Sequence, residues 1–403
     1  MTKEKQKKQK GRGPMDWMLL LIVAALVIFG LIMQYSASSY DLDLVKKQGI
    51  FAAAGFAAVF LISLIPPRII NKLSLAFYGA SLVMTGATAV LGRTVKGARR
   101  WIEIGPVRFQ PSEMVKAGLI LALACVICKY FHEINGLERI RFTEFFRNYK
   151  EIDKKVFLRE RRGYLLPILL IAAAAALVVI VTKDLGTAII IFGIGFLILL
   201  SVSPGIRYLL TVLIVAACAG VGFTLLFPYR MGRISAWLDL QHNTSDLGYQ
   251  IQEGLYAIGS GGWFGRGLGK SVQKVFIPEP HTDMIFTIVC EELGIIGGIF
   301  LIVLFVILLL RLRRIYHEIT DLYGKIIVAG VTAHIGLQSV INMAVMANLL
   351  PNTGVPLPFI SYGGTSLLIL LGEIGLVLSV YRERLDRAKN NVYDTGYVIR
   401  ETQ

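Results

Sequence analysis

Long apolar runs separated by short polar segments dominate the chain. About ten of these runs approach the roughly 20 residues that an α-helix needs to cross the hydrocarbon of a bilayer. The pattern predicts an all-α integral membrane protein, because a spanning segment must satisfy its own backbone hydrogen bonds in lipid. The predicted spanning runs are Met15 to Tyr35, Gly49 to Ile65, Leu73 to Leu91, Met114 to Phe131, Tyr164 to Val181, Leu185 to Val202, Tyr208 to Phe227, Met284 to Leu310, Ile326 to Leu350 and Ser361 to Tyr381.

The distribution of Lys and Arg predicts the orientation of this bundle. An even number of spans places both termini on one side, and most of the 42 basic residues fall in segments on that side. Basic residues are enriched in cytoplasmic loops, so we expect both termini to be cytoplasmic. The predicted organisation is a basic cytoplasmic tail (1–14), a single polytopic membrane domain (15–381) and a cytoplasmic C-terminal tail (382–403).

The composition agrees with a membrane protein and excludes an ordinary soluble one. Hydrophobic residues make up 55% of the chain, charged residues 17%, and the mean hydropathy is +0.63. The net charge of +15 does not indicate nucleic-acid binding, because the basic residues lie in short loops beside apolar runs and form no known DNA- or RNA-binding motif. All four cysteines lie within apolar runs, so neither a disulfide framework nor a zinc site is predicted.

Three polar loops lie on the predicted outer side: Gly92 to Glu113, Pro228 to Thr282 and Pro351 to Ile360. The second is a large extracellular loop between the seventh and eighth predicted helices, and long loops often carry function. The first loop is basic, against the usual trend for outer loops, so it faces either an anionic ligand or anionic lipid headgroups. Its basic residues are Arg93, Lys96, Arg99, Arg100 and Arg108.

Two pairs of opposite charges lie where the loops meet the apolar runs. Glu113 and Lys116 are three residues apart, so they can pair on one helix face, either structurally or as part of a buried functional site. Lys183 and Asp184 interrupt two apolar runs, either as a tight turn or as charges directed into a shared polar cavity. Ser112 is the predicted N-cap of the fourth helix.

Asp283 ends an acidic, proline-containing loop and directly precedes the eighth apolar run. One interpretation is structural: Thr282 or Asp283 caps the following helix. The other is chemical, because a carboxylate at the membrane boundary can act as a base on a substrate anchored in lipid. Several titratable groups near this helix entry favour the second interpretation. They are Glu279, His281, Glu291 and Glu292.

Two further outer segments carry special backbone signals. The stretch Ala257 to Gly269 contains six glycines, which permit close backbone approach, but it lacks the Gly-x-x-x-x-Gly-Lys-Ser/Thr pattern of a nucleotide-binding loop. The stretch Leu350 to Ser366 contains three prolines and includes Ser361. Irregular backbone at membrane depth must be buried in protein or line a cavity, so this stretch is expected to form one wall of a central cavity.

Together these motifs resemble the SEDS family (shape, elongation, division and sporulation) of bacterial cell-wall proteins over nearly the whole chain. The segments at 249–252 and 259–265, Tyr-Gln-Ile-Gln and Gly-Ser-Gly-Gly-Trp-Phe-Gly, resemble the FtsW and SpoVE branch more than RodA. The other motifs are Arg-Arg-Trp-Ile (99–102), Gln-Pro-Ser-Glu (110–113), Lys-Asp-Leu-Gly-Thr (183–187), Pro-Glu-Pro-His-Thr-Asp (278–283) and Pro-Phe-Ile-Ser-Tyr-Gly-Gly (358–364).

The resemblance implies a peptidoglycan glycosyltransferase that polymerises lipid II at the outer face of the bacterial cytoplasmic membrane, with Asp283 as its catalytic residue. It also implies a class B penicillin-binding protein as partner, among other division or elongation proteins. No cofactor is required by the motifs, although a divalent cation is possible, and no protein metal site is predicted. The residues expected to bind substrate are Arg99, Arg100, Trp101, Glu113, Lys116, Lys183, Asp184, His281 and Ser361.

Two other functions are compatible with the same sequence. A flippase that moves the same lipid intermediate would also need many helices and intramembrane charges. Its alternating access calls for comparable polar machinery on both faces, whereas the motifs here concentrate on one. A scaffold that only recruits a transpeptidase leaves Asp283 and the basic loop unexplained.

Overall fold

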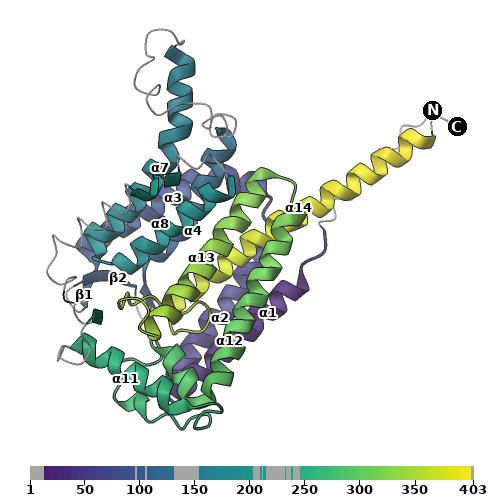
Figure 1. Ribbon diagram of the computed structural model, residues 1–403. Helices are drawn as coiled ribbons and strands as arrows, with labels where there is room; N and C mark the ends of the chain where they lie inside the picture. Colours follow the sequence, from purple (N-terminus) through teal and green to yellow (C-terminus); the bar gives the residue numbers. More distant parts are fainter. Residues whose placement is uncertain are drawn as a thin grey trace.

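The computed structural model describes residues 13–95, 98–104, 107–130, 154–202, 209–210, 212–214, 232, 237–238 and 246–400. These residues form a bundle of long α-helices (Figure 1). In this part of the chain, eight helices are long and apolar enough to cross a membrane. They are α1 (Trp17–Ala37), α2 (Leu42–Ser63), α3 (Pro67–Leu91), α4 (Pro111–Lys129), α8 (Leu185–Val202), α12 (Ile285–Glu318), α13 (Leu322–Met346) and α14 (Gly364–Arg400).

The predicted all-α membrane fold is confirmed, and most predicted runs coincide with a helix. The fifth run corresponds to α7 (Lys154–Thr182), whose apolar part, Leu166–Thr182, is shorter than the eight candidate spans. The seventh run, Tyr208 to Phe227, lies almost wholly outside the described residues, so the count of ten spans stays a prediction. Helix α14 continues to Arg400, well into the predicted C-terminal tail.

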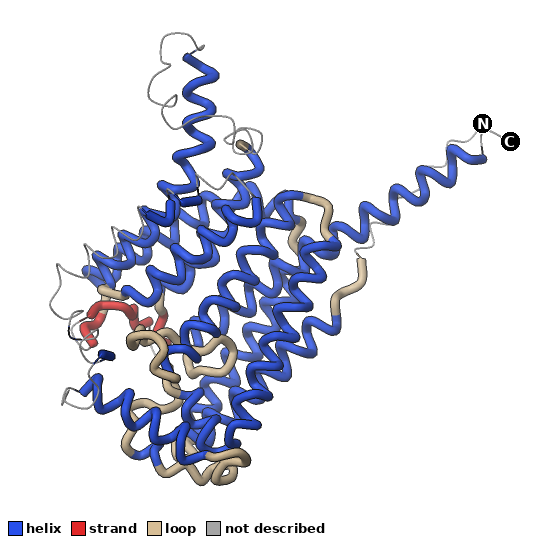
Figure 2. The backbone as a smooth tube through the Cα atoms, viewed as in Figure 1, coloured by secondary structure: helices blue, strands red, loops and turns tan. Residues whose placement is uncertain are grey.

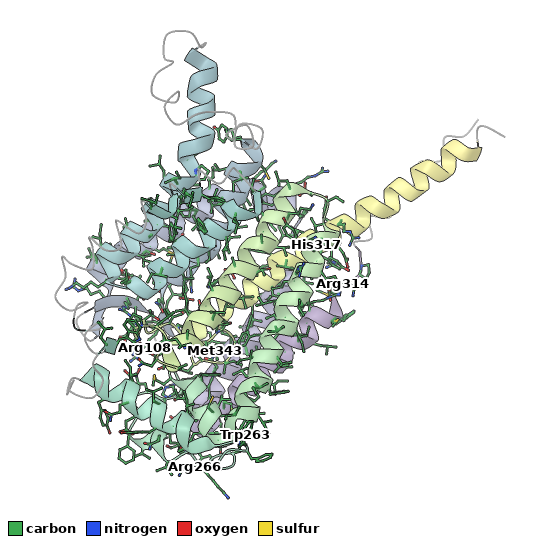
Figure 3. All side chains as sticks on the ribbon, viewed as in Figure 1. Arg108, Trp263, Arg266, Arg314, His317 and Met343 are labelled. Carbon is green, nitrogen blue, oxygen red and sulfur yellow. The ribbon has the colours of Figure 1, made fainter. Side chains whose placement is uncertain are left out.

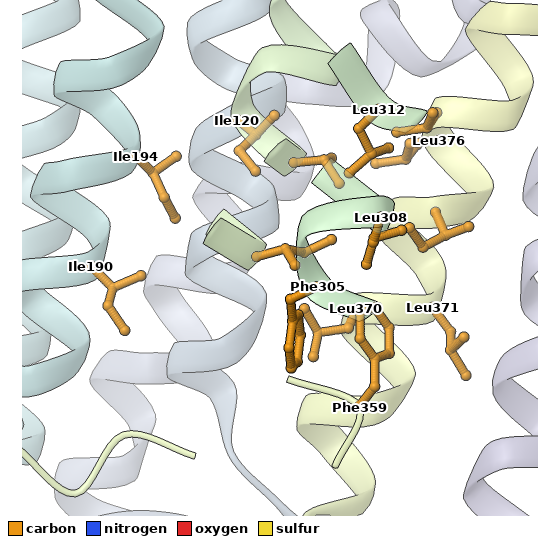
Figure 4. Close-up of a cluster of buried hydrophobic side chains, with 14 of the residues drawn as sticks. Ile120, Ile190, Ile194, Phe305, Leu308, Leu312, Phe359, Leu370, Leu371 and Leu376 are labelled. Carbon is orange, nitrogen blue, oxygen red and sulfur yellow. The ribbon is translucent and has the colours of Figure 1, made fainter. Parts of the chain in front are cut away.

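Apolar side chains lie both inside and on the outer surface of the bundle. Inside, Phe305 and Leu308 of α12 lie in the same buried cluster as Leu370 and Leu371 of α14 (Figure 4). On the outside, many large apolar side chains of the spanning helices are exposed, such as Leu21, which is 69% exposed. Apolar surface on this scale is expected to face lipid rather than water.

The end of the bundle that carries Arg311, Arg314 and Arg384 is called the basic face here. Arg311 of α12 pairs with Asp16, which also caps α1 by accepting a hydrogen bond from Leu19 N at 2.9 Å. Figure 3 shows Arg314 and His317 at this end and Trp263 and Arg266 at the opposite end. The two ends of the bundle therefore differ in chemistry.

The opposite end, called the loop face here, carries a small sheet that the sequence did not predict. Strands β1 (Arg93–Val95), β2 (Ala98–Ile104) and β3 (Val107–Phe109) form an antiparallel sheet in the order β1-β2-β3 (Figure 2). Their register pairs Arg93 with Trp101 and Ile102 with Phe109. The basic loop is thereby a folded element joining α3 to α4.

Helix α12 is divided by a kink at Gly294, where φ is +70° and ψ is −169°. Only glycine adopts this conformation readily. A straight helix of 34 residues would be about 51 Å long, well beyond the hydrocarbon thickness of about 30 Å. The kink separates a spanning part, residues 295–318, from a short first part, residues 285–293, which lies on the loop face.

The glycine-rich stretch begins in the last residues of α11 (Asp246–Gly261), and the part that follows the helix packs against this kink. Arg266 N and Gly267 N donate to the carbonyl oxygens of Glu291 and Glu292, each at 2.9 Å, while Ile295 N donates to Gly262 O. The kink removes the usual partners of these backbone groups, and the neighbouring stretch supplies new ones. The glycines are needed because the two backbones touch.

Replacing Gly265 with alanine is expected to destabilise the protein by at least about 1–3 kcal/mol. Gly265 has a φ of +77°, and a Cβ there would lie 2.1 Å from Glu292 O. Gly259→Ala is the matched control, because a Cβ at that helical position meets nothing within 4 Å. Thermal unfolding in detergent should show a lowered melting temperature for Gly265→Ala alone; equal melting temperatures would contradict the packing described.

Candidate active site

Asp283 lies on the loop face, immediately before α12. The N-cap of α12 is Met284 and makes no side-chain cap hydrogen bond, so the interpretation of Thr282 or Asp283 as the helix cap is wrong. The Asp283 side chain is half-buried and accepts a hydrogen bond from Thr282 Oγ1 at 3.0 Å. A Cβ at the exposed Gly354 would lie 4.0 Å from Asp283 Oδ2, so the carboxylate faces the segment between α13 and α14.

That segment, residues 351–363, is non-helical and largely buried, as expected for an irregular wall at membrane depth. Its interior end packs into the bundle through Phe359, which is 3% exposed and lies near Leu370 in Figure 4. Helices α1 and α2 also hold it, because Gln34 Nε2 donates to Ile360 O at 2.8 Å and Gly363 N donates to Gln48 Oε1 at 3.2 Å. The wall is therefore fixed from several helices at once.

Two predicted site residues join this wall to the Asp283 loop. Ser361 Oγ donates to Thr282 O at 2.7 Å and accepts from Leu357 N. Tyr362 N donates to His281 O at 2.9 Å, and the rings of His281 and Tyr362 are 5.5 Å apart. Burial lowers the pKa of His281 below its usual value, outweighing the nearby carboxylates of Glu279 and Asp41. The ring is therefore protonated less readily than that of an exposed histidine.

Arg100, Lys183 and Asp184 form a second part of the site at the turn between α7 and α8. Arg100 Nη1 lies 3.5 Å from Asp184 Oδ2, and the same guanidinium donates to the carbonyl oxygens of Thr182 and Lys183. Asp184 also caps α8, accepting from Thr187 N at 3.1 Å. Lys183 and Asp184 therefore form a turn between two helices and also belong to a polar cluster, two interpretations that the sequence left as alternatives.

This turn is adjacent to the wall that faces Asp283. A Cβ at Gly186, the second residue of α8, would lie 2.7 Å from Thr353 O, so α8 begins against the residue that precedes Gly354. Lys183 is exposed and has a φ of +53°. Two cationic side chains, Arg100 and Lys183, thus lie at the border of the same surface as the carboxylate.

Glu113 and Lys116 form the predicted pair, and it is fully buried. Lys116 Nζ lies 2.9 Å from Glu113 Oε1, with side-chain exposures of 1% and 3%. Lys116 Nζ also donates to Gln338 Oε1 at 2.8 Å. His334 lies 3.0 Å from the same oxygen and 2.8 Å from Glu373. The pair is one end of a buried polar network across α4, α13 and α14, out of reach of a bulky substrate in this conformation.

Arg99 and Trp101 point away from the turn that Arg100 contacts. Successive side chains of a strand point to opposite faces, so Arg100 reaches the turn before α8 whereas its neighbours face the other way. Arg99 donates to Ala89 O near the end of α3, and Trp101 is half-buried. Ser112 is not an N-cap, because α4 begins at Pro111 with Gln110 as its N-cap.

Glu291 and Glu292 were expected near Asp283, but they lie at the other end of residues 285–293. Both are fully buried. Glu291 accepts from Ser271 Oγ and Val272 N, while Glu292 accepts from Ser36 Oγ at 2.6 Å. They join the first part of α12 to the end of α1 and to the preceding loop. These contacts hold the first part of α12 in place.

The sequence interpretation missed Gln338 and Asn342 of α13. Both are buried and contact residues 351–363: Gln338 Nε2 donates to Pro356 O at 3.0 Å and Asn342 Nδ2 donates to Val355 O at 2.8 Å. Two amides spaced i, i+4 in an apolar run share one helix face. Their i, i+4 spacing within an apolar run could have predicted a buried polar contact on this face of the helix.

The described residues hold no metal cluster, and one cavity that they form lies away from Asp283. Among the described residues, no group of three His, Cys, Asp or Glu side chains is placed to hold a metal ion. A cavity of about 650 Å³ lies instead between α8, α12 and α13, and Arg313 and His317 line it at the basic face. That cavity is separate from the site described here.

Comparisons with known proteins agree over most of the chain. The family model FTSW_RODA_SPOVE, described as "Cell cycle protein", matches residues 16–386. Stage V sporulation protein E of Bacillus subtilis is 36% identical over 91% of this chain and 97% of the relative. A probable peptidoglycan glycosyltransferase FtsW of Geobacter sp. is 31% identical over 91% of this chain and 96% of the relative.

Solved structures give the same result for the fold. One is described as "Structural coordination of polymerization and crosslinking by a peptidoglycan synthase complex"; it is 31% identical, with a TM-score of 0.75 over 92% of this chain and 98% of that one. The rod shape determining protein RodA of Thermus thermophilus is 30% identical, with a TM-score of 0.65 over 92% and 97% of the two chains. The chain therefore belongs to the SEDS family of cell cycle proteins, in the FtsW and SpoVE branch that its motifs predicted.

Proposed function

We propose that this protein is a peptidoglycan glycosyltransferase that polymerises lipid II into glycan strands, for division or for the sporulation septum. The observation that carries the proposal is the environment of Asp283: a carboxylate that does not cap its helix and faces an exposed glycine. The FtsW relatives are named as probable peptidoglycan glycosyltransferases, which supports the same activity here.

In the proposed reaction, Asp283 accepts the proton of the acceptor sugar's 4-hydroxyl group. The oxygen forms a bond to C1 of the donor sugar as the bond between C1 and the diphosphate oxygen breaks, and the electron pair leaves with the lipid diphosphate. General-base catalysis of this kind contributes about 10²–10⁴-fold in rate. A single displacement needs only one carboxylate because the diphosphate is already a good leaving group.

Arg100 and Lys183 are the proposed contacts for the leaving diphosphate. A developing anion is stabilised by cations fixed in advance, and Arg100 is already oriented by Asp184 at 3.5 Å. A guanidinium can hold a phosphate through two parallel hydrogen bonds. Lys183 is exposed beside it and can approach a phosphate without breaking a buried contact. Lys116, by contrast, is not a proposed phosphate contact, because its ammonium group is buried against Glu113 and Gln338.

The loop face is proposed to lie outside the cell. The arginines of the basic face indicate a cytoplasmic location for that end, which places Asp283 at the outer leaflet of the cytoplasmic membrane. No ATP is available there, and a sugar on a lipid diphosphate carries its own activation. An active site on the outer face therefore fits a substrate that is activated as a lipid diphosphate.

A membrane-anchored class B penicillin-binding protein is the proposed partner, together with other division proteins. The support is the related solved structure, which is described as a synthase complex that coordinates polymerization and crosslinking. A cross-linking enzyme would consume the strands that this protein makes. A divalent cation, if required, is proposed to act on the substrate's diphosphate.

The test is glycan chain formation by the purified protein with its partner in detergent or proteoliposomes. Labelled lipid II is added with and without Mg²⁺, and products are separated by length. The proposal expects chains many disaccharides long. Translocation of lipid II in sealed vesicles without chain formation would instead favour the flippase.

A further inference from the structure

A buried asparagine joins the two segments that form the proposed site. Asn342 is 1% exposed and lies near the end of α13 on the loop face. Its Nδ2 donates one hydrogen bond to the peptide oxygen of Asp283 and another to that of Val355, both at 2.8 Å. One NH₂ group thus uses both of its hydrogens to connect the Asp283 loop with residues 351–363.

The chemistry of these contacts fixes the orientation of the carboxamide. If the amide were turned over, Oδ1 would face two carbonyl oxygens and repel both. Among the described residues, Oδ1 meets no hydrogen-bond partner, so the side chain serves the surrounding protein as a donor only. An aspartate of the same shape has no hydrogen for either carbonyl when ionised.

The two carbonyls belong to the proposed base and to the wall that it faces. One belongs to Asp283 itself, and the other belongs to Val355, which follows the Gly354 that the carboxylate faces. Asn342 therefore adds a link at Asp283 itself to the contacts that Ser361 and Tyr362 make with the preceding residues of this loop. We infer that Asn342 is a positioning residue for Asp283, which holds the base at the correct distance from the wall where the acceptor sugar binds.

A comparison with Gln338 distinguishes positioning of Asp283 from simple support of the wall. It lies one turn before Asn342 and donates to Pro356 O at 3.0 Å, while its own oxygen accepts from Lys116. Gln338 therefore links residues 351–363 to the buried network, whereas Asn342 contacts both the wall and the Asp283 loop. Loss of Asn342 should affect the reaction step more than substrate binding.

The inference rests on the proposed function and is tested by steady-state polymerisation kinetics of the purified protein with its partner. Asn342→Asp is expected to lower kcat by at least about 10²-fold, the effect of misplacing a reacting group by about 1 Å, while KM for lipid II changes less than about threefold. Asn342→Ser, which keeps one donor, should lie between Asn342→Asp and wild type. Ser339→Ala is the matched control, because this buried serine donates only within α13, to Ile335 O.

Three kinetic results would overturn the inference. They are a kcat of Asn342→Asp within about threefold of wild type, a loss confined to KM, or an equal loss in Ser339→Ala. If neither Asn342 variant gives folded protein, the residue supports the fold rather than the reaction, and the inference is also wrong. Asp283→Asn is measured in parallel: its retained activity would refute the proposed base, whereas its loss combined with active Asn342 variants would refute positioning alone.

Discussion

Replacing Lys116 with methionine is expected to lower the free energy of unfolding by about 3–5 kcal/mol. Lys116 and Glu113 are almost completely buried, and their charged atoms are 2.9 Å apart. Without the ammonium group, the Glu113 carboxylate would remain buried without the cation that pairs with it. Thermal unfolding in detergent should show a strongly lowered melting temperature for Lys116→Met.

The matched control removes both charges. Glu113→Gln combined with Lys116→Met should regain most of the lost stability, because replacing a buried ion pair by uncharged groups is often neutral or stabilising. A double-mutant cycle isolates the pair from the separate contact of Lys116 with Gln338. A double variant that is no more stable than Lys116→Met would show that the pair is not the source of the effect.

The fold could be predicted where its determinants are local in sequence. Hydropathy and length identify the spanning helices, and the i, i+3 spacing identifies the Glu113–Lys116 pair. The kink at Gly294 could not be predicted, because a long apolar run has the same hydropathy whether straight or bent. The residues that pack against the kink, such as Gly265, come from another segment of the chain.

The candidate site shows the same division. Asp283 could be identified from its place between an acidic loop and an apolar run. A capping role could be excluded only from the observed start of α12. Glu291 and Glu292 were predicted to lie near Asp283, but the short helical segment 285–293 places them at its other end. Asn342 was missed because its two partners are 59 and 13 residues away along the chain.

Replacing Asp283 with asparagine is expected to reduce glycan polymerisation by about 10²–10⁴-fold. The amide keeps the size of the side chain and an oxygen for the hydrogen bond from Thr282 Oγ1, but it cannot take the proton of the acceptor hydroxyl group. Because the side chain is half-buried and caps no helix, the melting temperature should stay close to that of the wild type.

The most direct measurement of the central claim is the initial rate of chain formation from lipid II by three purified proteins with their partner: wild type, Asp283→Asn and Asp43→Asn. Asp43 is an exposed carboxylate on α2 and provides the same chemical change on the protein surface. We predict wild-type rates for Asp43→Asn and a loss of at least about 10²-fold for folded Asp283→Asn. Polymerisation by Asp283→Asn at the wild-type rate would contradict the assignment of Asp283 as the base.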